Sequence, residues 1–70
     1  MEDNTARYLL EFRYQDEMNW TEGSSFSHLK YAKQCVDATL TNFSVVTEGR
    51  VFDWKRMAYR YYRSAYPFEP

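Results

Sequence analysis

A single apolar stripe at helical spacing constrains the fold of this chain more than any other feature of its sequence. Its members follow one another at intervals of three or four positions, along one face of an α-helix: Leu29, Ala32, Val36 and Leu40. Ser27 has the side chain of a helix N-cap, and Phe26 and Tyr31 stand where a hydrophobic staple is expected. We therefore predict an amphipathic helix from Ser27 to about Asn42, whose apolar face needs a second layer to cover it.

Segments on both sides of this helix have the patterns of strands. From Arg7 to Tyr14, aromatic and aliphatic residues alternate with charged ones, which is typical of a half-buried strand. Leu9 interrupts the polar side of that strand and indicates partial cover there. The pair Glu48-Gly49 is predicted to form the tight turn of a hairpin, because such turns favour glycine. We predict three further strands, at Trp20–Ser24, Phe43–Thr47 and Arg50–Asp53.

The tail from Asp53 to Ala65 has two interpretations. Its apolar residues again fall at helical spacing, with Asp53 as a possible cap and Pro67 as a stop: Trp54, Met57, Ala58, Tyr61, Tyr62 and Ala65. Read as a strand, the segment would lengthen the hairpin but would mix arginines with aromatics on one face. We predict a helix from Asp53 to Ala65, packed through Trp54, Met57 and Tyr61, with the strand as the alternative.

These elements predict a small α+β domain, an antiparallel sheet in the order ββαββ with one packed helix and a C-terminal helix. All 70 residues form a single domain in this interpretation, with residues 1–6 frayed and 67–70 a short tail. A domain of this size has a thin core, which this chain supplements with large side chains, since 20% of its residues are aromatic. We expect Leu29, Val36 and Leu40 to contact Leu10 and Phe12.

The charges are unevenly distributed although the formal net charge is only −1. Six acidic residues stand against two basic ones in residues 1–22, and five basic residues against one acidic one in 50–63. We therefore expect a dipolar domain. No apolar run approaches the roughly 20 residues that span a bilayer, and the acidic N-terminus lacks the layout of a signal peptide. We expect a cytoplasmic protein that does not bind membranes.

Few residues here could carry chemistry. His28 and Cys35 are seven positions apart, two helical turns or about 10 Å, which is too far for a nucleophile and its base. Asp16 and Glu17 are neighbours in a connection and fit a solvated surface better than a proton-sharing pair. One Cys and one His cannot build a zinc site alone, and there is no phosphate-binding glycine loop. We predict no catalytic residue, no metal and no cofactor, and a protein that is not an enzyme.

The tail supplies the candidate binding residues, which interleave bases with tyrosine: Lys55, Arg56, Tyr59, Arg60 and Arg63. On a helix, the last four would share one face. That face could meet an acidic protein surface, because Arg and Tyr are enriched at binding hot spots, or nucleic acid by charge and stacking. A solvated face, with arginine stems covering aromatic rings, is the purely structural interpretation. The acidic residues of the first half could conversely imitate phosphates: Glu11, Asp16, Glu17 and Glu22.

Three segments give the chain a resemblance to small phage-encoded host-takeover proteins, including anti-CRISPR proteins: Tyr8–Phe12, Ser27–Lys33 and Phe43–Gly49. They share with those proteins an early strand, a helix that starts at serine and a closing hairpin. The resemblance is one of architecture. It implies a stoichiometric inhibitor acting in the host cytoplasm, and no site residue carries over from it.

We therefore expect a small protein-binding module, an inhibitor of a host protein or protein complex. The alternative is a nucleic-acid-binding module that uses the basic and aromatic tail. A third hypothesis is a homo-oligomer whose aromatic residues form the subunit interface.

Overall fold

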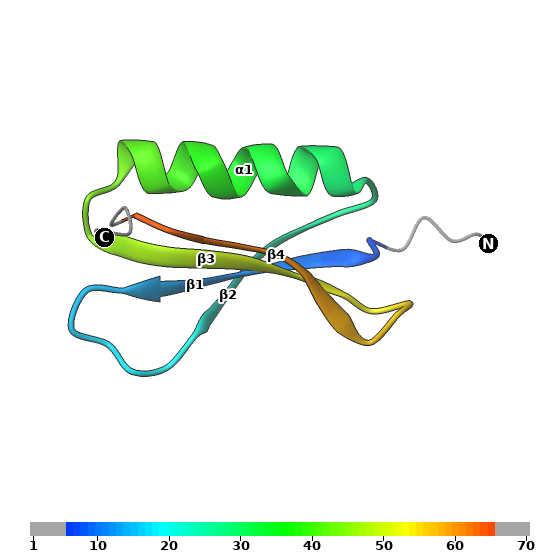
Figure 1. Cartoon of the computed structure of the whole chain (residues 1–70), viewed down its shortest axis with the longest axis horizontal. Coiled ribbons are helices and arrows are strands. Elements are labelled where there is room, and N and C mark those ends of the chain that lie inside the picture. Colours follow the sequence, from blue (N-terminus) through cyan, green and yellow to red (C-terminus); the bar gives the residue numbers. More distant parts are fainter. Residues whose placement is uncertain (1–5, 66–70) are drawn as a thin grey trace, which may run out of the picture.

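The structure, a computed structural model, describes residues 6–65 and contains one helix and four strands (Figure 1). Their bounds are β1 Tyr8–Tyr14, β2 Thr21–Phe26, α1 Leu29–Asn42, β3 Val46–Asp53 and β4 Ala58–Ser64. The strands form one antiparallel sheet in the order β2-β1-β3-β4. The α+β class and the ββαββ order are confirmed. The expected fraying of residues 1–5 and the tail with Pro67 lie outside the described residues.

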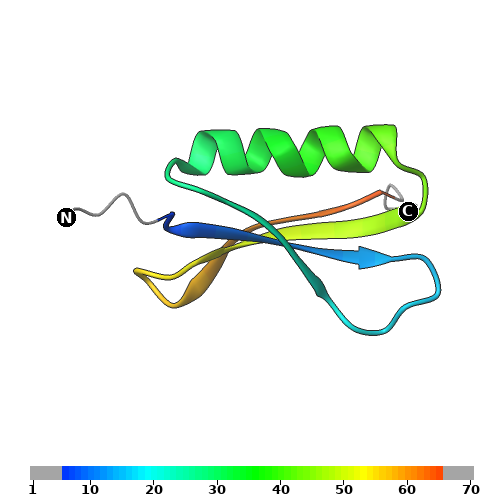
Figure 2. The ribbon, with the colours of Figure 1, turned by 180° about the vertical axis from the view of Figure 1, so that it is seen from behind.

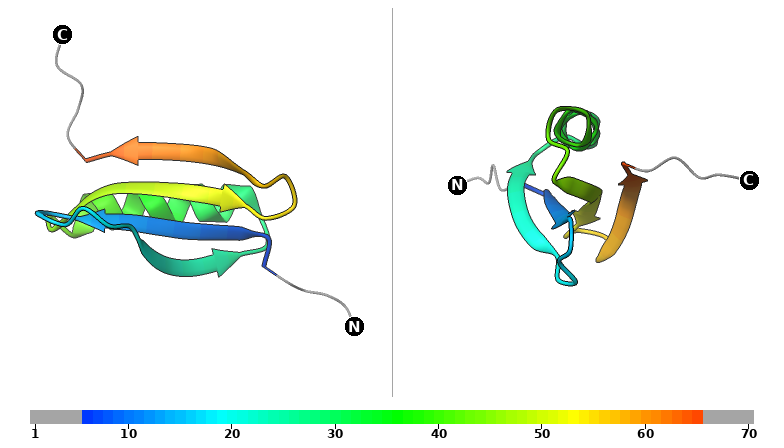
Figure 3. Two further views of the ribbon diagram at one scale, coloured as in Figure 1. Left: turned by 90° about the horizontal axis from the view of Figure 1, so that it is seen from below. Right: turned by 90° about the vertical axis from the view of Figure 1, so that its left-hand side faces the viewer.

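The sheet and the helix form two layers (Figures 1 and 2). Seen along the long axis of the molecule, α1 lies over the middle of the sheet, and β2 and β4 are its edges (Figure 3). No helix in the described part of the chain is long and apolar enough to cross a membrane.

The core lies between α1 and the two central strands. Its buried residues are Tyr8, Leu10, Phe12, Ala32, Val36, Leu40, Val46 and Val51, with Leu29 partly buried against them. The predicted helical stripe and its contact with Leu10 and Phe12 are therefore confirmed. Leu9 is also buried, but it points to the other side of the sheet because side chains alternate along a strand. Leu9 is therefore covered on that side of β1, as the sequence indicates.

The helix begins later than the sequence suggests. Its N-cap is His28, which makes no side-chain capping hydrogen bond. The expected cap at Ser27 is wrong because β2 extends to Phe26, so Ser27 belongs to the connection. β2 also begins at Thr21 and not at Trp20.

The predicted hairpin turn at Glu48-Gly49 is wrong, because both residues lie within one continuous strand, β3. Gly49 does not have a positive φ. A Cβ atom there would lie 2.8 Å from Val36 Cγ1 and 3.1 Å from the ring of Phe12. The glycine is needed because the helix packs closely on the sheet at this point, and not because the chain turns.

The predicted C-terminal helix is also wrong, because Ala58–Ser64 forms β4 and pairs with β3. Val51 pairs with Tyr61 but Phe52 pairs with Tyr59, so Arg60 is an extra residue in β4. Such a bulge locally replaces the two-residue repeat of a strand by a three-residue one. Tyr59 and Tyr62 therefore share a face at a spacing that resembles a helix.

Gly49→Ala should lower the free energy of unfolding by about 1–3 kcal/mol, because the added methyl group overpacks the helix–sheet contact. In a Val36→Ala background the same substitution should cost less, since the clashing methyl is gone. Urea denaturation of the four proteins in this cycle measures the coupling, with Ser25→Ala on exposed β2 as a control. An equal cost in both backgrounds would contradict this role of Gly49.

Candidate functional site: the open face of the sheet

The sheet face opposite α1 is not covered by any element within residues 6–65 (Figures 1 and 3). Alternation and strand register place a mixed set of aromatic and charged residues on it. We call this surface the open face, and it consists of Leu9, Glu11, Arg13, Trp20, Glu48, Arg50, Phe52, Trp54, Tyr59 and Tyr62.

Three aromatic residues of the open face, Phe52, Trp54 and Tyr59, form one connected group at the end where β3 turns into β4. The ring of Phe52 meets those of Trp54 and Tyr59 edge to face, each at 5.0 Å between centroids. This arrangement is favourable for aromatic pairs, and it accompanies the burial of the neighbouring Leu9, which pairs with Phe52. Trp54, Tyr59 and Tyr62 nevertheless keep 51%, 49% and 54% of their surface exposed.

Arg50 lies at the centre of the open face between two rings. Its guanidinium carbon is 3.8 Å from the centroid of Trp20 and 4.2 Å from that of Tyr59. Arg50 Nε donates a hydrogen bond of 2.7 Å to Glu11 Oε1, to which the Tyr59 hydroxyl also donates at 3.1 Å. Burial, and then the bond to Glu11, raise the pKa of Tyr59. The cation is thus held by stacking and by a carboxylate together.

A second network of ion pairs and hydrogen bonds lies beside the contacts of Arg50. Arg13 forms an ion pair with Glu48, and the Tyr62 hydroxyl donates to Glu48 Oε2 at 2.7 Å. This hydrogen bond raises the pKa of Tyr62. Glu22 of β2 lies in register with Glu11. The open face therefore has no excess of positive charge, because each of its arginines is paired with a glutamate.

The five candidate residues from the tail do not share one face. Tyr59 lies on the open face, whereas Arg60 Nη1 bonds to Asp53 and Arg63 Nη1 to Asp37, each at 2.9 Å. Lys55 and Arg56 lie in the exposed β3–β4 turn. The predicted basic face is wrong because it required a helix, and the bulged strand separates its members instead.

Asp53 holds the turn that presents Trp54. Its side chain is fully buried and accepts bonds from Arg7 Nε and Nη2 at 2.7 and 2.9 Å, besides that from Arg60. The backbone N–H groups of Lys55 and Arg56 also donate to it, at 3.0 and 3.3 Å. Arg7 first, then Arg60 and these N–H groups, hold the pKa of Asp53 well below its usual range, against the effect of burial.

The bonds from residues 55 and 56 are those that a helix N-cap would accept, so the sequence signal at Asp53 was a genuine one. Met57 then adopts a positive φ of 52°. The chain reverses there and returns as β4 instead of continuing as a helix.

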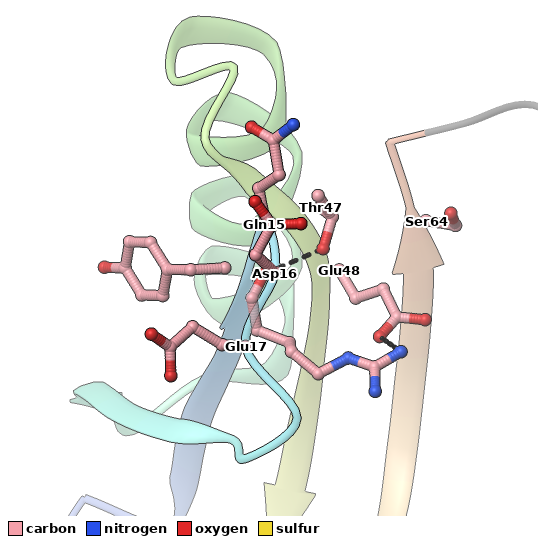
Figure 4. Close-up of a pocket in the computed structure, with 8 residues that line it drawn as sticks. Gln15, Asp16, Glu17, Thr47, Glu48 and Ser64 are labelled. Carbon is pink, nitrogen blue, oxygen red and sulfur yellow. Dashed lines mark hydrogen bonds and ion pairs between the residues drawn. The ribbon is translucent and has the colours of Figure 1, made fainter.

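A polar pocket lies at the opposite end of the sheet, beside Asp16 and Glu17 (Figure 4). Thr47 Oγ1 donates to the carbonyl oxygen of Arg13 at 3.1 Å. Figure 4 shows that the carboxylates of Glu17 and Glu48 point to opposite sides of β1. No three His, Cys, Asp or Glu side chains gather as a metal site within residues 6–65.

Sequence reasoning missed Trp20, Arg50 and Phe52 as site residues. The signal was present in β3, where Glu48, Arg50 and Phe52 alternate with buried positions. The turn assigned to Gly49 divided that pattern in two.

Comparison of the chain with protein-family models, curated proteins and solved structures finds no match.

Asp53→Asn should destabilise the protein at neutral pH and flatten the acid side of its stability curve. A carboxyl group whose pKa is lower in the folded state contributes stability above its unfolded pKa of about 3.9, and loses it as pH falls toward the folded pKa. Urea denaturation between pH 7 and 2.5 measures both effects.

The parent and Asp53→Asn curves should converge in acid. Asp37→Asn is the comparison, because hydrogen bonds from Tyr61 and Arg63 also lower the pKa of the half-exposed Asp37. Parallel parent and Asp53→Asn curves over this range would show that the charge of Asp53 does not stabilise the turn.

Proposed function

We propose that this chain is a non-enzymatic protein-binding module and that the open face is its contact surface. The observation that carries the proposal is the group of half-exposed aromatic rings, Trp54, Tyr59 and Tyr62, on an uncovered sheet. Tyr and Trp are enriched at interface hot spots because they bury much apolar area with few rotatable bonds. Two of these rings are already fixed by hydrogen bonds to Glu11 and Glu48, which lowers the entropy lost on binding.

The charge arrangement supports a protein partner over nucleic acid. Phosphate binding requires cations that are free to neutralise the backbone. Arg13, Arg50, Arg60 and Arg63 each have a carboxylate partner within the chain. Lys55 has no ion pair among the described residues, and Arg56 is 4.0 Å from Asp53 and largely exposed. Lys55 and the largely exposed Arg56 in one turn make a weak phosphate-binding surface.

On the basis of the resemblance to phage-encoded inhibitors, we further propose that this chain acts as an inhibitor. We take the partner to be a host protein or protein complex in the cytoplasm, blocked by one copy of this chain occupying a functional surface. Neutral, preorganised aromatic surfaces are suited to such stoichiometric binding, because their affinity depends little on salt.

The test begins with a pull-down from bacterial lysate by the tagged parent and by the double variant Trp54→Ala/Tyr62→Ala. The matched control is Tyr31→Ala, because Tyr31 lies on α1 and is 50% exposed. The partner retained by the parent should be retained by the control and lost by the double variant. Calorimetric titration with the purified partner should give one-to-one stoichiometry and at least a tenfold weaker Kd for each single variant.

Two results would count against the proposal. The first is a partner that the double variant retains and Tyr31→Ala loses, which would move the interface to the helix. The second is retention of random DNA or RNA by the parent at low salt that Lys55→Gln/Arg56→Gln abolishes. That result would favour the nucleic-acid alternative.

A further inference from the structure

An apolar groove lies on the other side of the sheet, between β2 and the C-terminal half of α1. Phe12, Cys35 and Thr39 line it, together with the more exposed Tyr14, Phe43 and Val45. The last three keep 39%, 58% and 52% of their surface exposed. This groove shares no residue with the open face.

The groove exists because β2 has almost no side-chain volume beside it. Gly23 and Ser24 form the β2 wall, and a Cβ atom on Gly23 would lie 3.0 Å from Phe12 Cε2. The helix packs mainly on β3, so it does not close the space above β2. The ring of Phe12, which is otherwise buried in the core, therefore forms part of the groove wall.

The strand beside the groove has a free edge. β2 is the last strand of the sheet and pairs only with β1, and no backbone bond on its outer side occurs within residues 6–65. It contains no Lys, Arg or Pro, which commonly protect an edge from pairing. β4, the other edge, carries a bulge and two arginines. β2 also has an extra residue between Glu22 and Ser25, but it has no basic side chain to repel an added strand, so it is the more open of the two edges.

The negative charge beside the groove determines which charge an added strand must carry. Asp16 and Glu17 line the polar pocket that adjoins the groove at Tyr14. Neither carboxylate has a hydrogen bond or an ion pair among the described residues. Arg13, the base nearest in sequence, is paired with Glu48. A segment that enters here meets uncompensated negative charge and therefore needs a lysine or an arginine of its own.

We propose that the free edge of β2 binds an extended segment of a partner protein. The segment adds a strand to the sheet through backbone hydrogen bonds. It places an apolar side chain in the groove against Phe12 and Cys35, and a Lys or Arg side chain against Asp16 and Glu17. This site lies on the α1 side of the sheet and does not depend on the function proposed for the open face.

The probe is a displayed library of random ten-residue peptides selected on the full chain, followed by synthesis of the strongest binder. Selected peptides should alternate apolar and polar residues, with Lys or Arg near one end. Cys35 is the only cysteine of the chain and lines the groove, so its rate of alkylation reports occupancy directly. Saturating peptide should slow that alkylation by about tenfold or more.

Two variants separate the groove from its surroundings. Thr39→Trp fills the groove and should weaken peptide binding at least tenfold, whereas Ala38→Trp, on the exposed neighbouring position, should leave it unchanged. Asp16→Lys/Glu17→Lys should weaken binding and reduce its dependence on salt. Tyr62→Ala should have no effect, so failure here and failure of the open-face proposal are distinguishable.

The proposal is overturned by a selection that yields no alternating basic peptide, or by binders that do not protect Cys35. Equal affinities of Thr39→Trp and Ala38→Trp would also overturn it. Light scattering of the free chain tests a different occupant. Self-association that protects Cys35 and is lost in Thr39→Trp would assign the groove to a second copy.

Discussion

One helix covers one face of a four-stranded sheet, and the other features of this molecule follow from that arrangement. The helical stripe ending in Val36 and Leu40 buries Leu10, Phe12 and Val51 on one side. On the other side the sheet shields its own apolar positions. Phe52 and its neighbouring rings lie beside the buried Leu9, and Trp20 and Tyr59 enclose the guanidinium of Arg50. Large aromatic side chains thus take the place of a second covering layer on this face, and these side chains remain half exposed.

The same arrangement explains why the arginines are paired. A guanidinium held close to a sheet surface loses part of its hydration, and a charge-assisted bond to a carboxylate offsets that loss. Arg50 has Glu11, Arg60 has Asp53, and Arg63 has Asp37. The basic stretch visible in the sequence is therefore largely neutralised in the fold. This neutralisation is the physical ground for favouring a protein partner on the open face.

The two proposed surfaces differ in the kind of recognition they allow. The open face presents rigid aromatic rings whose side-chain contacts would carry the affinity. The groove beside β2 combines the backbone groups of an edge strand with an apolar space, and the two carboxylates of Asp16 and Glu17 lie in the adjoining pocket. Its affinity would therefore come from strand addition. Both arise from the position of α1, which packs mainly on β3, so that no element within residues 6–65 covers the opposite face or the space beside β2.

The sequence by itself determined the elements whose signals are local. The stripe from Leu29 to Leu40 and the alternation from Tyr8 to Phe12 needed only side-chain periodicity, and the structure confirms both. The tertiary structure decided the rest. Gly49 avoids a clash with a helix that precedes it by several residues, and the bulge at Arg60 depends on pairing with β3. Neither constraint is visible in a window of neighbouring residues, because the atoms that impose it come from another element. For the same reason the partners of the arginines, and with them the charge of each surface, were fixed only when the strands came together.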